Sequence, residues 1–279
     1  MLNRQRILLY LIQELQHKAK FTKTAVDKML FLLLKEYSFG EKAKFYSFYP
    51  YKFGPFSQLF YYDLRKMESV GCLEGNGMNL TAQGAKEAGH LEPELKECIG
   101  QAIARFPSAE KLIDYVYARY PDYTVKSELK ALPLAKPLPG FYTIGYEGKN
   151  IDSFLDILIR NQIQEIIDVR HNPFSMNFTF TKAKLAGYLD SVGIRYVHMP
   201  ELGIPGEYRQ SLNDAGDYEK LFEFYRKTIL GEFSLEKLAA RGRKGRVALL
   251  CMEKEHVRCH RGVISKALGQ MGFEVTHLY

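Results

Sequence analysis

The fold of the second half of the chain is decided by residues 141–170, which read FYTIGYEGKNIDSFLDILIRNQIQEIIDVR. Short apolar runs at 141–146 and 164–170 predict two strands, and the apolar residues of 151–162 repeat with the period of an amphipathic helix. A strand, a helix and a second strand in this order predict a right-handed crossover between parallel strands. This unit is the building block of an α/β domain.

The same alternation continues to residue 279. We expect further strands at 194–200, 246–253 and 273–279. We expect helices between them at 181–193, 217–230, about 233–241 and 260–272. Residues 141–279 are therefore predicted to form an α/β domain with a doubly wound, mostly parallel sheet.

The first 90 residues show a different pattern, which predicts a mainly helical domain. Amphipathic helices are expected at 3–17, 24–37 and 57–69. After them, GCLEGNGMNLTAQG (71–84) predicts two strands joined by a tight Gly-Asn-Gly turn. Three helices followed by a hairpin make up a winged-helix domain, a helix-turn-helix variant that often binds nucleic acid.

The middle of the chain connects these two regions. Residues 91–128 continue with helical patterns and are expected to form a helical extension that bridges the two domains. The segment LKALPLAKPLPG (129–140) contains three prolines and has no helical or strand period. Because closely spaced prolines favour a stiff, extended chain, we interpret 129–140 as an interdomain linker.

Composition and charge limit the class of protein. Lys and Arg number 39 against 32 Asp and Glu, for a net charge of +7, and residues 1–136 hold 20 of the basic and 15 of the acidic residues. This excess is compatible with DNA as a partner and equally with solubility alone. The basic run Arg241, Arg243, Lys244 and Arg246 has the same two interpretations, phosphate binding or a solvated loop.

The expected location is the cytoplasm. No window approaches 18 consecutive apolar residues and the first residues lack a signal-peptide pattern, so we expect no membrane association. The four cysteines are too scattered for a disulfide framework, which favours a reducing compartment. No cofactor is expected.

Polar side chains end the predicted parallel strands, where ligands bind in open sheets of this type. Asp168 and Arg170 end one strand, Glu201 follows the next, and Cys251 and Glu253 end the most apolar one. A buried acid and base destabilise a fold unless they are paired or functional. Asp168 and Arg170 can therefore form either an internal ion pair or part of a site.

The first 90 residues resemble the winged-helix domains of the Panacea (SocA-like) antitoxin group. The resemblance rests on Lys28 with the MLFLLL run, Tyr49-Pro50-Tyr51, Gly54-Pro55-Phe56-Ser57 and the Leu73/Leu80 pair. Most of these aromatic residues are expected to fix a turn and to bury their rings. Lys52 is the exception, because a cation on a rigid loop is well placed to contact phosphate.

Residues 141–279 resemble the domain-of-unknown-function family 488. The motifs that carry this resemblance occur in order: Thr143-Ile144-Gly145-Tyr146, Asp168-Val169-Arg170, Pro173 with Ser175 and Phe178, Tyr196-Val197-His198, Pro200-Glu201-Leu202-Gly203, Leu250-Cys251-x-Glu253 and Cys259-His260-Arg261. The usual family form has a second glycine where this chain has Ile204. The resemblance implies a nucleic-acid-associated protein and, most concretely, a DNA glycosylase that excises oxidised or hydroxymethylated pyrimidines.

Such a reaction needs a carboxylate, because the N-glycosidic bond breaks through an oxocarbenium-like sugar. Asp168 is the first candidate, followed by Glu253 and Glu201. The base must also leave the stack and enter a pocket. The residues expected to contact nucleic acid are Asn172, Phe174, Ser175, Asn177 and Phe178 in the loop after Asp168, together with Arg170, and His260 and Arg261 at the start of the last long helix. At least one of Phe174, Phe178 and Phe180 is expected to cover the sheet as part of the core.

Other functions are open. The segment from Cys251 to the following helix resembles that of rhodanese-type sulfurtransferases, in which a thiolate at a strand end carries a persulfide, although nine residues separate Cys251 from Arg261. Cys251, His256, Cys259 and His260 could instead bind a metal, but their spacing is not a common zinc pattern and no metal is predicted. A third alternative is a regulator or antitoxin that binds DNA and senses a small ligand.

Overall fold

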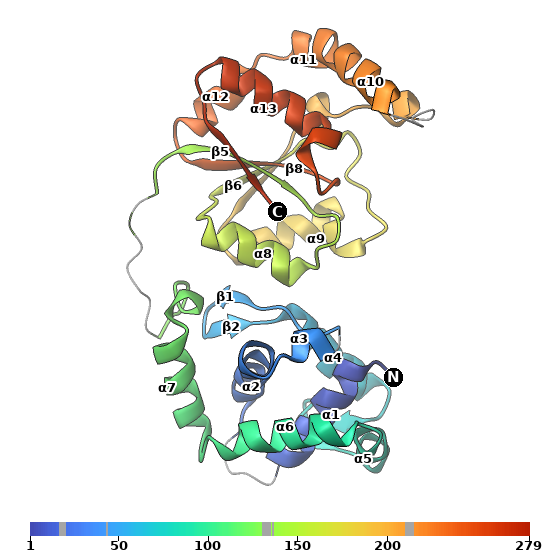
Figure 1. Ribbon diagram of the computed structural model, residues 1–279, viewed down its shortest axis with the longest axis vertical. Coiled ribbons are helices and arrows are strands. Elements are labelled where there is room, and N and C mark those ends of the chain that lie inside the picture. The colour runs from blue at the N-terminus through green and yellow to red at the C-terminus, as the bar shows by residue number, and fades with distance from the viewer. Residues whose placement is uncertain (17–20, 43, 130–134, 136, 210–214) are drawn as a thin grey trace. The chain divides into compact units, whose positions relative to one another are not determined.

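The computed structural model describes the whole chain except residues 17–20, 43, 130–134, 136 and 210–214. The chain divides into two compact units, Met1–Leu134 and Ala135–Tyr279 (Figure 1). The boundary falls in the proline-rich segment expected to be a linker. Of that segment, residues 130–134 and 136 lie outside the described residues.

A five-stranded parallel sheet forms the centre of the second unit. Its strands are β5 (Gly140–Gly145), β6 (Glu165–Asp168), β7 (Arg195–His198), β8 (Arg246–Cys251) and β9 (Val275–Leu278). They lie in the order β7-β6-β8-β5-β9, and every neighbouring pair is parallel. The parallel sheet predicted from the sequence is thereby confirmed.

Helices cover both faces of this sheet. On one face lie α8 (Ile151–Arg160) and α9 (Lys182–Ser191); on the other lie α12 (Glu236–Gly242) and α13 (His260–Gln270) (Figure 1). Asn150 fixes the start of α8, because its side chain accepts a 2.9 Å hydrogen bond from the backbone of Ser153. Strand β8 is buried over all residues after Arg246, as expected for a central strand covered on both faces.

One predicted helix of this unit is divided into two. Residues 217–230 were expected to form a single helix, but the structure has α10 (Ala215–Lys227) and α11 (Ile229–Glu232). The interruption is at Thr228, whose φ of −102° and ψ of −79° depart from the ideal α-helical values of about −63° and −42°. Its hydroxyl donates a 2.8 Å hydrogen bond to the carbonyl of Phe224, a contact that often bends helices.

The first unit is mainly helical. Its helices are α1 (Asn3–Leu15), α2 (Lys23–Glu36), α3 (Phe39–Lys42), α4 (Gln58–Ser69), α5 (Ala82–Gly89), α6 (Pro93–Ala104) and α7 (Ala109–Arg119), followed by the 3₁₀ turn η1 (Pro121–Tyr123). The hairpin predicted at 71–84 is present as β3 (Leu73–Glu74) and β4 (Asn79–Leu80). Its turn requires left-handed backbone at Gly75, Asn76 and Gly77, which explains the Gly-Asn-Gly sequence.

The aromatic segment before α4 forms a second hairpin, which the sequence did not predict. Strands β1 (Tyr49–Tyr51) and β2 (Gly54–Phe56) are antiparallel, and Gly54 has a φ of 91°. The hairpin is attached to α2 by Lys28, whose buried ammonium donates a 2.8 Å hydrogen bond to the carbonyl of Pro55. Burial lowers the pKa of Lys28 to about 8. Helix α2 therefore fixes the position of the β1–β2 hairpin.

Among the described residues, every helix is too short or too polar to cross a membrane.

Candidate functional site

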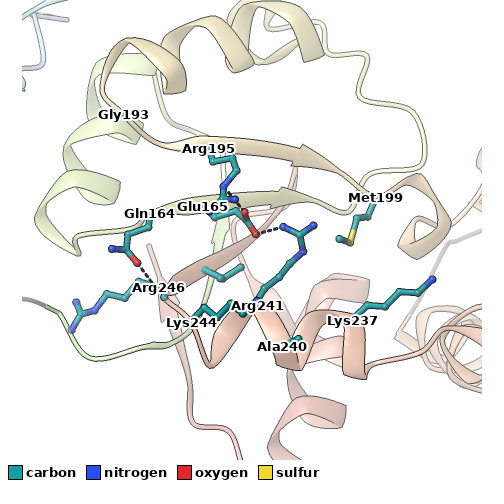
Figure 2. A pocket seen from close by; sticks show the side chains of 12 residues that line it. Gln164, Glu165, Gly193, Arg195, Met199, Lys237, Ala240, Arg241, Lys244 and Arg246 are labelled. Carbon is teal, nitrogen blue, oxygen red and sulfur yellow. Dashed lines mark hydrogen bonds and ion pairs between the residues drawn. The ribbon is translucent and has the colours of Figure 1, made fainter.

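The amino ends of the strands border a basic cavity of about 850 Å³ (Figure 2). Five cationic side chains line it: Arg195, Lys237, Arg241, Lys244 and Arg246. The carboxylate of Glu165 lies between Arg195 and Arg241, 2.8 Å from each. Three members of the basic run predicted from the sequence thus face this cavity, whereas Arg243 pairs with Glu236.

A second cavity, of about 190 Å³, lies at the opposite edge of the sheet, where the strands end. Its lining residues are Tyr146, Arg170, His171, Asn172, Phe174, Ile204, Gly206, Arg209, Cys251 and Met252. The sequence predicted a site at this edge, and this cavity brings together predicted residues from β8 and from the segment after β6. We therefore describe it as the candidate site.

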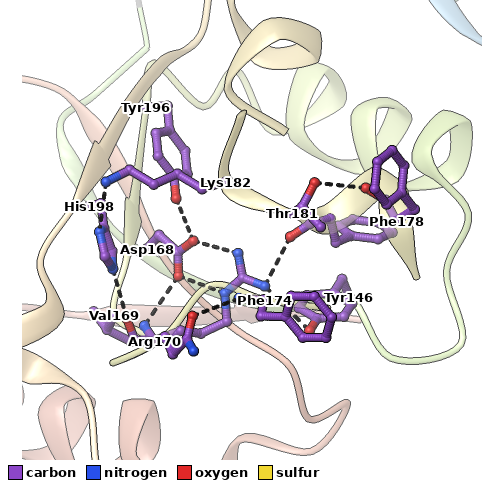
Figure 3. A network of polar contacts seen from close by, with 12 residues as sticks. Tyr146, Asp168, Val169, Arg170, Phe174, Phe178, Thr181, Lys182, Tyr196 and His198 are labelled. Atoms are coloured by element: carbon purple, nitrogen blue, oxygen red, sulfur yellow. Dashed lines mark hydrogen bonds and ion pairs between the residues drawn. The ribbon is translucent and has the colours of Figure 1, made fainter. Parts of the chain in front are cut away.

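Asp168 does not line this cavity, because it forms a buried ion pair with Arg170 (Figure 3). Its carboxylate is fully buried and accepts hydrogen bonds from Arg170 Nε at 2.8 Å and Nη2 at 2.5 Å. It also accepts from the backbone N–H of Arg170 at 3.1 Å and from the hydroxyl of Tyr196 at 2.6 Å. The internal ion pair is the alternative that the structure shows, and Asp168 has no face open to a substrate.

Arg170 connects this pair to the cavity. Its Nη1 donates to the carbonyl of Phe180 at 3.0 Å and to the hydroxyl of Tyr146 at 3.3 Å. The guanidinium lies over the Tyr146 ring, 5.1 Å from its centroid. Burial, and then the Asp168 carboxylate, raise the pKa of Tyr196 above its ordinary value. Arg170 therefore positions the wall of the cavity and has few donors left for a ligand.

The loop after Arg170 presents exposed apolar side chains. Phe174 is 73% exposed, Met176 99% and Phe178 69%, whereas Phe180 is fully buried and stacks on Tyr146 with 4.5 Å between ring centroids. The prediction that at least one ring covers the sheet is confirmed by Phe180.

Only part of this loop reaches the cavity. Asn172 and Phe174 line it, but Ser175, Asn177 and Phe178 do not. Ser175 is buried, and Asn177 is turned toward Thr179, whose hydroxyl it accepts at 2.7 Å. A loop of ten residues can direct successive side chains to different sides, which is why its composition did not show which of them share a pocket.

Cys251 lies at the end of β8 beside two residues that begin α13. Its Sγ is 3.9 Å from Nδ1 of His260, and Sγ of Cys259 is 3.8 Å from the same nitrogen. The two sulfurs and this nitrogen lie within 4.8 Å of one another, so these three residues could hold a metal ion. A hydrogen bond with Cys259 holds the pKa of Cys251 well below its usual range despite burial, and His260 acts in the same direction.

His256 does not belong to this cluster, contrary to the four-residue set considered from the sequence. Its ring stacks on His277 with 3.4 Å between centroids, and its Nδ1 is 2.8 Å from the hydroxyl of Tyr279. The potential metal ligands that the structure brings together are therefore Cys251, Cys259 and His260.

Arg261 and His260 were expected to contact phosphate, but both are 1% exposed and neither lines the cavity. Arg261 donates to the carbonyls of Glu253 at 2.6 Å and Lys254 at 2.8 Å. The same segment passes so close to Gly145 that a Cβ there would lie 1.8 Å from the carbonyl oxygen of Glu253. Arg261 therefore fixes the backbone after β8, and Gly145 is required by this close approach.

Glu253 does not itself line the cavity, but its carboxylate contacts two side chains that do. It follows the lining residue Met252, its Oε2 is 3.0 Å from Cys251 Sγ, and its Oε1 is 3.8 Å from Nη1 of Arg209. Burial, and then Cys251, raise its pKa. Glu201 is exposed in the 3₁₀ turn η3 (Pro200–Leu202) and does not line the cavity.

Lys52 is exposed at the turn between β1 and β2. Its ammonium forms a 3.0 Å ion pair with Glu128, and each side chain is at least half exposed. Phosphate would therefore have to compete with a solvent-screened carboxylate at this position.

Sequence reasoning missed Arg209, which reaches the cavity from the 3₁₀ turn η4 (Gly206–Arg209). It lies in the long connection after β7, which has no periodic pattern that could place it. The unusual Ile204 is buried and lines the cavity, while the close backbone approach is at Gly203, where a Cβ would lie 2.1 Å from the backbone nitrogen of His171.

The comparison with protein families supports the interpretation of the second unit. No curated protein and no solved structure matches the chain. The family model described as "Domain of unknown function DUF488" matches residues 150–268, from the start of α8 into α13. The match thus includes most of the segments that form the candidate site, and the resemblance of the C-terminal region to this family is confirmed.

Proposed function

We propose that this protein binds DNA and that the cavity at the carboxyl ends of the strands receives a single base swung out of its strand. The observation that carries the proposal is the composition of one small cavity. It combines the aromatic rings of Tyr146 and Phe174, the amide of Asn172 and the guanidinium of Arg209, with Arg170 positioning its wall.

Each of these groups suits part of a flipped nucleotide. Stacking on an aromatic ring contributes about 1–3 kcal/mol per base. An Asn amide can donate to and accept from a base edge, and an arginine matches the geometry of phosphate oxygens. The exposed ring of Phe174 lines the cavity and can stack on a base that leaves its strand.

The reaction that we propose is excision of an oxidised or hydroxymethylated pyrimidine. Glu253 replaces Asp168 as the proposed carboxylate, since it adjoins the cavity and Asp168 is bound to Arg170. Glu253 takes a proton from water, the water oxygen bonds to the sugar C1′, and the electrons of the glycosidic bond leave with the base.

The remaining basic surfaces are proposed to hold the DNA backbone. The helices and the β3–β4 hairpin of residues 1–90 support a winged-helix docking domain. The cations around the amino-end cavity can bind phosphate, because five of them face it and, within the described part of the chain, Glu165 is the one carboxylate that lines it and pairs with Arg195 and Arg241.

Incubation with duplexes that contain modified pyrimidines, followed by alkali, tests the activity. Strand breakage only at the modified position is the expected result. If the protein binds these duplexes with a salt-dependent affinity and leaves them intact, the enzymatic proposal is wrong and a DNA-binding regulator remains.

Phe174→Ala is expected to weaken binding of a duplex with one unpaired pyrimidine by about 5- to 150-fold, the loss of one stacking contact. Fluorescence anisotropy at fixed salt measures this change. The control is Tyr218→Ala, which removes an exposed ring from α10 outside the cavity. Equal affinities of the two variants would contradict the role of Phe174.

A further inference from the structure

Three metal-ligating side chains meet at the end of β8, and the function proposed above uses none of them. Cys251 is the last residue of the strand, while Cys259 and His260 stand at the start of α13. All three are at most 2% exposed. The strand end and the helix start therefore enclose two thiols and an imidazole away from water.

Their spacing is that of ligands around a tetrahedral ion. With Zn–S bonds of about 2.3 Å and Zn–N bonds of about 2.0–2.1 Å, tetrahedral ligand atoms lie roughly 3.6–3.8 Å apart. The two sulfurs lie 3.9 and 3.8 Å from Nδ1 of His260. These two distances differ from tetrahedral values by a few tenths of an ångström, and all three ligand atoms lie within 4.8 Å of one another.

The imidazole is held in the form that binds a metal. Nε2 of His260 lies 2.9 Å from the carbonyl oxygen of Val169, which can only accept a hydrogen bond. Nε2 therefore carries the hydrogen, and in the neutral ring the lone pair of Nδ1 faces both sulfurs. A hydrogen bond of this kind to a backbone carbonyl is the usual support of a metal-bound histidine.

We propose that Cys251, Cys259 and His260 bind one zinc ion. Two thiolates and an imidazole in tetrahedral spacing favour zinc over harder cations such as magnesium or calcium. A divalent ion also compensates the negative charge of the two thiolates in a buried position.

One of the three proposed ligands faces the candidate cavity. Cys251 lines that cavity, and Oε2 of Glu253 is 3.0 Å from the sulfur of Cys251. Three protein ligands with one open position are typical of catalytic zinc. If base excision is correct, a zinc ion held by these residues would lower the pKa of a bound water and Glu253 would accept the proton of that water; this last point rests on the proposed function.

Metal content tests the site without any assay of activity. The full-length protein, purified without chelator, is expected to contain about one zinc per chain by mass spectrometry of the metal. After chelation, Zn²⁺ titrated against a chromophoric chelator is expected to rebind, and Co²⁺ is expected to give the absorption of a tetrahedral thiolate complex.

Cys259→Ser is expected to lower zinc affinity by more than about 100-fold, because changes outside the ligand set already cost 10- to 100-fold. The matched control is Cys98→Ser on α6, which lies outside the cluster and keeps the metal. Zinc is also expected to raise the melting temperature of the wild type and of Cys98→Ser. It is not expected to raise that of Cys259→Ser, and this difference separates loss of the metal site from loss of the fold.

The proposal is overturned if the purified protein contains no metal, binds no added Zn²⁺, and has thiols that react equally fast with and without Zn²⁺. A persulfide formed from thiosulfate at Cys251 in such a protein would favour the sulfurtransferase alternative. Zinc binding with intact modified duplexes supports the metal site and contradicts base excision, so the two proposals fail separately.

Discussion

Asp168→Asn is expected to lower the free energy of unfolding of the second unit by about 3–5 kcal/mol, because it leaves a buried guanidinium without its counter-charge. The side chain of Arg170 is 6% exposed and that of Asp168 is fully buried, so water cannot replace the lost carboxylate. For a unit of this size the melting temperature is expected to fall by roughly 6–20 °C. Thermal unfolding measures this fall, and hydrogen exchange in β6 and β8 assigns it to the second unit.

Asp156→Asn is the matched control for this change. Asp156 pairs with Arg160 one turn away on the surface of α8, where such a pair is worth about 0.3–0.5 kcal/mol. A loss of stability no larger than that of the control would contradict the structural role of Asp168. The double variant Asp168→Asn, Arg170→Met is expected to be less destabilised than the sum of its single changes, because no unpaired charge remains.

Glu253→Gln is expected to reduce release of a modified pyrimidine by at least about 100-fold, the contribution typical of a general acid or base. The amide keeps the size of the side chain but cannot take a proton from water. Single-turnover cleavage measures the chemical step, and duplex affinity is expected to stay close to that of the wild type because no cavity-lining ring or guanidinium is changed.

Glu219→Gln, on the exposed surface of α10, controls for the charge change. Zinc content of Glu253→Gln is measured alongside, so that a loss of activity is not confused with a loss of metal. An active Glu253→Gln variant would show that another group performs the proton transfer.

The sequence predicted the second unit well because its central strands β6 and β8 are almost fully buried. Continuous apolar runs such as that of β8 have no other common interpretation when helices with a clear period separate them. The break at Thr228 was not predictable from periodicity, because the apolar pattern continues through the residue whose backbone angles are distorted.

The site was only partly predictable for a different reason. Residues that end strands, such as Asp168 and Cys251, could be placed at one edge of the sheet from the pattern alone. Whether Asp168 faced a ligand or Arg170 depended on side-chain geometry, which the sequence leaves open. Arg209 lies in an aperiodic connection, so its approach to Cys251 and Glu253 depends on a tertiary path that no local signal describes.

The close contact at Gly145 has a consequence for how the candidate site recognises a ligand. Because β5 and the segment after β8 touch there without an intervening side chain, and Arg261 holds that segment, the backbone next to the lining residues Tyr146 and Met252 is held in place before a ligand binds. A backbone held in this way spares the entropy of ordering on association. Competing ligands are then expected to differ mainly in their dissociation rates. Ligands whose shape does not fit the cavity are expected to be rejected.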